Sequence, residues 1–191
     1  MYSAIALVGP PSAGKSSVIK LLRKKHNREF TVAFLDEVAT KVLDQIPHFR
    51  NLSPALFQAS ITSNQIQAEE AVFDSFDQNG VEEAILITDR GTHDFYCYTT
   101  PEQAEALQCR FTFSQYNLVV YLEPGPYVGT KGNPFRREKE NEIAELAQKT
   151  LEAWKSNHED FIRIPYCESL QDKAQLVADE INKFFNKKIF I

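Results

Sequence analysis

The chain has 191 residues, of which 43% are hydrophobic and 25% charged, enough to build the buried core of one domain over residues 1–191. Its net charge of −5 argues against a broad nucleic-acid-binding surface. No apolar run approaches the roughly 20 residues that span a bilayer, and the stretch Ala4–Val8 is too short for the core of a secretory leader. We therefore expect neither a membrane protein nor a secreted one. The three cysteines have no zinc-site spacing, so we expect free thiols in a cytoplasmic protein without nucleic-acid or membrane partners.

Short apolar runs alternate with longer amphipathic ones along the whole chain. The short runs are almost continuously apolar, as strands buried on both faces are. They predict strands at Ala4–Val8, Thr31–Leu35, Ala84–Thr88, Leu118–Leu122 and Phe161–Ile164. The longer runs predict helices at Lys15–Lys25, Pro54–Asp77, Pro101–Phe111, Pro134–Trp154 and Leu170–Phe185. This alternation predicts an α/β fold in which helices cover both faces of a parallel sheet.

The segment from Gly9 to Ser16, GPPSAGKS, is a complete G-x-x-x-x-G-K-S motif between a predicted strand and a predicted helix. Its glycines let backbone N–H groups turn toward phosphate oxygens, and the helix N-terminus adds its positive dipole end. Lys15 would neutralise the β- and γ-phosphates of ATP, and the Ser16 hydroxyl would bind Mg²⁺. We therefore predict that the nucleotide is bound by Gly9, Ser12, Ala13, Gly14, Lys15, Ser16 and Ser17.

Two of the predicted strands end in acidic residues that compete for the metal. Asp36 and Glu37 follow the second strand, a position that lies over the acceptor pocket in nucleoside-type kinases. Asp89 and Arg90 follow the third strand, where an Asp can hold Mg²⁺ or take a proton from an attacking hydroxyl. The Arg could grip a second anion with two parallel hydrogen bonds. Because a water-activating ATPase would favour Glu after the Asp, the Asp-Arg pair favours transfer to a bound acceptor.

These motifs resemble the NadR-like P-loop ATPase and kinase family, which includes ribosylnicotinamide kinase domains. The resemblance rests on Gly9 to Ser16, on Asp36-Glu37-Val38-Ala39, and on Asp89-Arg90-Gly91-Thr92-His93-Asp94 with Tyr98. The Asp-Arg segment and its downstream Tyr are also similar to thymidylate kinase. The resemblance implies a three-layer P-loop NTPase fold whose five parallel strands have the order 2-3-1-4-5. It also implies ATP as donor and Mg²⁺ as cofactor, and it leaves the acceptor open.

Three charged residues are candidates for binding the acceptor. Glu37 could bind an acceptor hydroxyl or act as a base, although capping of the next helix explains it equally well. Arg90 could hold the acceptor, and Asp94 could contact it or only pair with Arg90 on a helix face. One amide of the long helix after Pro54 could read a base, although an ordinary polar face is the simpler explanation for these residues: Gln58, Asn64, Gln65 and Gln67.

The segment 123–140 carries basic residues that suit a lid. Arg136 and Arg137 stand in the first turn of the helix predicted from Pro134, where positive charge opposes the helix dipole. We expect one of them to close over the phosphates and stabilise the transition state, with Gly129 and Gly132 as the hinge. A solvated charged face is the alternative explanation.

The sequence as a whole predicts an ATP-binding P-loop protein. We expect a Mg²⁺-dependent phosphotransferase for a small acceptor, of the nucleoside, nucleotide or nicotinamide riboside type. The predicted catalytic residues are Lys15, Asp89, Arg136 and Arg137, and the predicted metal ligands are Ser16 and Asp89. The alternative is an ATPase or nucleotide-gated regulatory module that takes no small-molecule acceptor.

Overall fold

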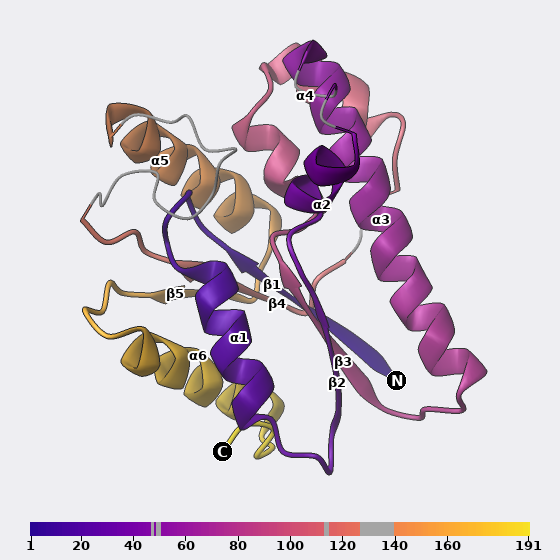
Figure 1. Ribbon diagram of the computed structural model, residues 1–191, viewed down its shortest axis with the longest axis vertical. Helices are drawn as coiled ribbons and strands as arrows, with labels where there is room; N and C mark the ends of the chain where they lie inside the picture. Colours follow the sequence, from indigo (N-terminus) through magenta and orange to yellow (C-terminus); the bar gives the residue numbers. More distant parts are fainter. Residues whose placement is uncertain (47, 49–50, 113–114, 127–139) are drawn as a thin grey trace.

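The computed structural model describes all residues except 47, 49–50, 113–114 and 127–139 (Figure 1). Its five strands form one parallel sheet in the order β2-β3-β1-β4-β5. The strands are β1 (Tyr2–Val8), β2 (Thr31–Leu35), β3 (Ala84–Asp89), β4 (Leu118–Leu122) and β5 (Phe161–Ile164). The predicted fold class and strand order are therefore confirmed.

Helices cover both faces of this sheet. One face carries α1 (Lys15–Lys25) and α6 (Leu170–Phe185), which lie side by side in Figure 1. The other face carries α3 (Pro54–Gln78) and α5 (Glu140–Asn157). The described residues also form three short elements: α2 (Val38–Gln45), the 3₁₀ helix η2 (Thr92–Cys97) and α4 (Pro101–Gln108). Of these, α2 follows β2 and η2 follows β3, so both lie at the edge of the sheet where those strands end.

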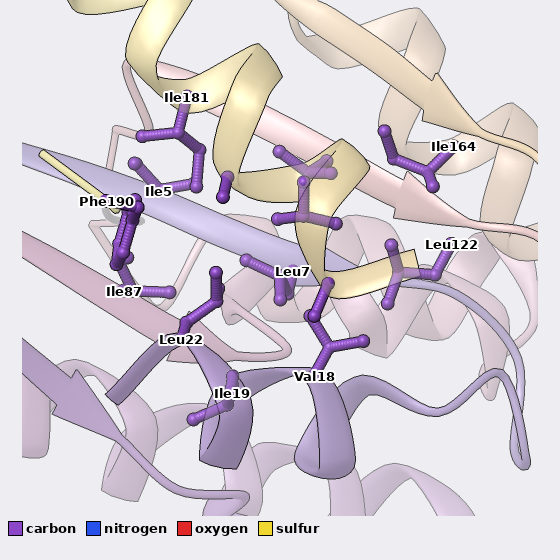
Figure 2. Packing of buried hydrophobic residues seen from close by; sticks show 14 of the residues in the cluster. Ile5, Leu7, Val18, Ile19, Leu22, Ile87, Leu122, Ile164, Ile181 and Phe190 are labelled. Carbon is purple, nitrogen blue, oxygen red and sulfur yellow. The ribbon is translucent and has the colours of Figure 1, made fainter. Parts of the chain in front are cut away.

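The apolar residues of β1 are divided between two cores because successive side chains of a strand point to opposite faces. Ile5 and Leu7 pack toward Val18 of α1 and Ile181 of α6, as Figure 2 shows. Ala4, Ala6 and Val8 face the other layer and pack with Trp154 of α5. Burial on both faces fixes β1 at the centre of the sheet and so fixes the loop that follows it.

The structure corrects several predicted boundaries. Helix α4 ends at Gln108 rather than Phe111, and α5 continues past Trp154 to Asn157. The prediction also missed α2 and η2. Both are short, eight and six residues, and about two turns carry too little apolar periodicity to be recognised.

Most of the predicted lid, 123–140, lies outside the residues that the structure describes. Gly129, Gly132, Arg136 and Arg137 lie outside the residues that the structure describes, so the lid and the single-domain organisation stay predictions. Among the helices that are described, none combines the length and the apolar character that crossing a membrane requires.

Candidate functional site

The loop between β1 and α1 has the curled backbone of a phosphate cradle. Gly9, Ser12 and Gly14 have φ angles of +142°, +65° and +90°, so left-handed residues turn the chain at three points. A Cβ on Gly9 would lie 2.5 Å from the carbonyl oxygen of Leu122. The end of β4 therefore leaves room only for glycine at the start of the loop.

Lys15 begins α1 and turns its side chain back onto the loop. Its Nζ donates hydrogen bonds to the carbonyl oxygens of Gly9 at 2.8 Å and Pro10 at 2.9 Å. Burial, helped by the positive charge of Arg90, lowers the pKa of Lys15 to about 8. A poorly hydrated ammonium group interacts more strongly with an anion than a hydrated one does. Lys15 is thus placed and charged to bind phosphate.

Ser16 and Asp89, the two predicted metal ligands, are in direct contact. The Ser16 hydroxyl donates to Asp89 Oδ2 at 2.5 Å. Asp89 is only 2% exposed, and within the described part of the chain its Oδ1 has no hydrogen-bond partner. Burial raises the pKa of Asp89, against the opposing influence of Lys15 and Ser16. A hydroxyl and an unpaired carboxylate oxygen at this point fit Mg²⁺, which prefers oxygen ligands.

Arg90 binds both of the other predicted acceptor residues, Glu37 and Asp94, so the three form one cluster. Its Nε donates to Glu37 Oε1 at 2.6 Å and its Nη1 to Asp94 Oδ2 at 2.7 Å. The Thr40 hydroxyl donates to the second oxygen of Glu37 at 2.7 Å. No group in the described ranges accepts a hydrogen bond from Nη2 of Arg90. The guanidinium is therefore held in place on two sides and keeps one nitrogen available.

The backbone of Arg90 is unusual as well. Its φ angle is +75°, a left-handed conformation that costs a non-glycine residue about 1–2 kcal/mol. The Thr88 hydroxyl donates to the Arg90 carbonyl oxygen at 2.5 Å, and the Arg90 N–H donates to the Leu7 carbonyl oxygen at 3.0 Å. The fold thus maintains a strained residue between β3 and η2, and strain of this kind is concentrated at functional sites.

Asp36 takes a different place from Glu37. It pairs with Arg23 at 2.6 Å on the surface, at the end of the edge strand β2. Because β3 lies between β2 and β1, Asp36 and Glu37 are not on the strand beside the P-loop strand, whereas Asp89 is. The strand order therefore favours Asp89 over Asp36 as the metal ligand.

A buried polar network behind the cluster was missed by the sequence analysis. Trp154 Nε1 donates to Asp94 Oδ1 at 2.8 Å. The Tyr116 hydroxyl donates to Glu69 Oε1 at 2.8 Å and accepts from the Thr92 N–H at 2.9 Å. The available signal was a lone tryptophan at the end of the apolar stripe of α5, which indicates a buried indole but not its partner.

Lys173 is a second residue that the sequence analysis missed. It lies on α6, is 3% exposed, and donates to the carbonyl oxygens of Ala13 at 3.2 Å and Glu123 at 2.8 Å. Lys173 thereby ties the P-loop to the segment after β4. Its signal in the sequence was a charged residue four positions before Val177 on the otherwise apolar face of α6.

The amides of α3 separate into two groups. Asn64 and Gln67 are exposed and bond to Ser60 and Ser63 of their own helix. Gln58 and Gln65 are buried, and Gln65 donates to Glu69 at 2.6 Å. Only the second group could contribute to a binding site.

Most of the chain matches a known protein family. The family model described as an AAA domain matches residues 4–173, which run from β1 into α6 and include the P-loop, Asp89 and Arg90. The chain belongs to the AAA domain family. No curated protein matches the chain.

Membership of the AAA domain family indicates that the P-loop binds nucleotide. P-loop NTPase domains generally bind it together with Mg²⁺, and in this AAA domain the Ser16–Asp89 pair has the donor atoms that such an ion requires. The family is consistent with an ATP-using kinase or ATPase.

Proposed function

We propose that this AAA domain is an ATP-dependent phosphotransferase that acts on a hydroxyl group of a small acceptor, as its resemblance to ribosylnicotinamide kinase domains implies. The observation that carries the proposal is the position of the Glu37–Arg90–Asp94 cluster. Arg90 directly follows Asp89, so a second set of partly buried charges adjoins the proposed metal ligand. A hydrolase that only activates water has no use for such a cluster.

Each residue of the site has a role in this proposal. Lys15 binds the β- and γ-phosphates, and Ser16 and Asp89 hold Mg²⁺, which neutralises phosphate charge when bound. Glu37 accepts a hydrogen bond from a second, non-reacting hydroxyl of the acceptor and so orients it, while Nη2 of Arg90 donates to the same acceptor. The hydroxyl oxygen bonds to the γ-phosphorus, the bond to the β-phosphate oxygen breaks, and the hydroxyl proton passes to Asp89.

The charges of the cluster favour an acceptor without phosphate. Two carboxylates, Glu37 and Asp94, face one guanidinium. Burial opposes the charge of Glu37, but Arg90, the Thr40 hydroxyl and Lys15 outweigh it and lower the pKa of Glu37 to about 2. The cluster is therefore negative near neutral pH and would repel an anion. A neutral or cationic hydroxyl compound, such as a nucleoside or nicotinamide riboside, fits better than a nucleotide.

The polar face of α3 supports a planar acceptor. At 3.6 residues per turn, positions 58, 62, 65 and 69 form one stripe, and all four side chains are buried. A buried helix face is normally apolar. The side chains of Gln58 and Thr62 make no hydrogen bond with another described residue. They are suited to bind the edge of a base or carboxamide.

The second candidate function is an ATPase or nucleotide-gated module without an acceptor. Membership of the AAA domain family favours it, since the family indicates nucleotide binding but no acceptor. In this function Arg90 would be a structural partner of Glu37 and Asp94.

The two functions are distinguished by ATP consumption across a panel of nucleosides, nucleotides and nicotinamide riboside, with a control that lacks acceptor. We expect at least one uncharged or cationic acceptor to increase consumption. We also expect Gln58→Ala to raise the KM for that acceptor, whereas Gln67→Ala, an exposed change on the same helix, leaves it unchanged. Consumption that no acceptor increases supports the ATPase.

A further inference from the structure

One carboxylate connects the only tryptophan of the chain to the acceptor cluster. Asp94 Oδ1 accepts from Trp154 Nε1 at 2.8 Å, and Asp94 Oδ2 accepts from Arg90 Nη1 at 2.7 Å. Asp94 is 8% exposed and Trp154 is fully buried. Because both oxygens of Asp94 are engaged, any turn of this carboxylate that follows the indole also moves its contact with the guanidinium.

The indole itself is held firmly. Its ring stacks on His158 with centroids 5.0 Å apart and meets Tyr116 edge-on at 5.5 Å. It also presses on the backbone beside Arg90, since a Cβ on Gly91 would lie 2.7 Å from Trp154 Cη2. Two separate contacts therefore link the indole to Arg90: the hydrogen bonds through Asp94 and the packing against Gly91.

We propose that Trp154 is a positioning residue that sets the orientation of the Arg90 guanidinium through Asp94. With the indole in place, the guanidinium keeps Nε on Glu37 and leaves Nη2 for the acceptor. Trp154 lies on α5 and Arg90 follows β3, so the link also makes Arg90 sensitive to the position of α5 on the sheet. The importance of Arg90 rests on the proposed function, but the coupling between the two side chains does not.

The first test measures hydrogen exchange at the Arg90 Nε–H by NMR, with the signal assigned by its loss in Arg90→Lys. Trp154→Phe keeps an aromatic ring and removes the indole donor. We expect the Nε–H of Arg90 to exchange with water about tenfold faster in this variant, because a displaced guanidinium weakens the hydrogen bond from Nε to the Glu37 carboxylate. A tenfold change is about the value of one hydrogen bond to a charged group.

The matched control is Tyr121→Phe, which removes the hydroxyl that donates to the Ala147 carbonyl oxygen of the same helix at 3.1 Å. It should leave the exchange of Arg90 Nε–H unchanged. Equal exchange rates in wild type, Trp154→Phe and Tyr121→Phe would overturn the proposal, since Trp154 would then only fill the core. A similar increase in both variants would overturn it as well.

A second test changes the acceptor cluster and measures the effect at Trp154, so it does not require Trp154→Phe to fold. The chain has one tryptophan, so its NMR spectrum contains one indole N–H signal. Glu37→Gln should shift this signal, because coupling between sites is reciprocal. Glu123→Gln, which alters the separate ion pair with Arg163, should not. A shift from Glu37→Gln no larger than that from Glu123→Gln contradicts the proposal. Neither test uses ATP or acceptor. Both tests of the Trp154–Arg90 coupling therefore remain valid even if the protein is not a phosphotransferase.

Discussion

The Ser16 hydroxyl donates a hydrogen bond to Asp89, a residue 73 positions later in the chain. The contact exists because β1 and β3 are parallel neighbours, with Leu7 in register with Asp89. The P-loop that follows β1 and the carboxylate that ends β3 therefore meet at one edge of the sheet, where ligands of open α/β sheets bind. Asp89 Oδ1 brings an unpaired buried oxygen to this edge.

We expect Asp89→Asn to abolish most Mg²⁺-dependent turnover and to leave the fold intact, because the change keeps the shape of the side chain and removes its charge. A loss of about a hundredfold is typical when a group that stabilises transition-state charge is removed. The measurement is turnover against Mg²⁺ concentration, with thermal unfolding as the check on folding. Asp36→Asn, at the exposed Arg23 pair, is the control and should turn over normally. Normal turnover in Asp89→Asn would remove Asp89 from the metal site.

Lys15→Ala should weaken the binding of Mg·ATP by about a hundredfold or more, since a buried ammonium aimed at phosphates is lost. Calorimetric titration with Mg·ATP measures this directly. Lys20→Ala removes an exposed lysine of the same helix and should bind ATP as the wild type does. Equal affinities for the two variants would show that the P-loop lysine has only a structural role.

Gly91→Ala should destabilise the protein by about 1–3 kcal/mol, the cost of overpacking a filled core. The added Cβ would lie 2.6 Å from the Tyr116 hydroxyl and 2.7 Å from Trp154. Gly80→Ala is the contrast: its Cβ would meet nothing within 4 Å, although its φ of +64° carries backbone strain. Urea unfolding measures both costs. Only Gly91→Ala should also alter acceptor-dependent turnover, and an unchanged turnover would separate Gly91 from the acceptor cluster.

Glu37 should contribute to stability in a defined pH window. Its pKa falls from 4.5 in an exposed group to about 2 in the fold, because Arg90, Thr40 and Lys15 together outweigh the effect of burial; the charge of Asp89 also faces it. A depressed carboxyl pKa means that the contribution is complete above about pH 4.5 and lost as the pH falls toward about 2.

The measurement is the free energy of unfolding in urea at about pH 6 and about pH 3, in wild type and Glu37→Gln. The wild type should lose more stability on acidification than Glu37→Gln does. Glu70→Gln, an exposed change on α3, should behave as the wild type. An identical acid loss in all three proteins would show that the charge of Glu37 is not stabilised by the fold.

The sequence predicted the elements that carry long or strongly apolar patterns. The limits of β2, β4, β5, α1 and α6 agree with the prediction, because each is bounded by a clear change in hydropathy. The P-loop and the Asp89–Arg90 segment could be placed because both follow directly from apolar strands. Their contact, by contrast, depends on β3 lying next to β1, and the strand order came from the family resemblance rather than from local pattern.

Only one contact of the Arg90 network could be predicted from spacing. The four-residue separation of Arg90 and Asp94 suggested their pairing on a helix face. The structure has that pair at 2.7 Å, but Arg90 precedes η2 and does not lie on a helix. The contacts of Glu37 with Arg90 and of Trp154 with Asp94 join residues 53 and 60 positions apart. The first pair depends on β2 lying beside β3, and the second on how α5 packs against η2. No periodicity in the sequence encodes either arrangement.

The most direct test of the account is the fate of the γ-phosphoryl group. Mass spectrometry of reactions with Mg·ATP and the acceptor panel should find a phosphorylated nucleoside or nicotinamide riboside in amounts equal to the ADP formed. Arg90→Ala should raise the KM for this acceptor and leave any acceptor-free hydrolysis unchanged. Inorganic phosphate equal to ADP in every reaction, with no phosphorylated product, would contradict the account and assign the protein to the ATPases.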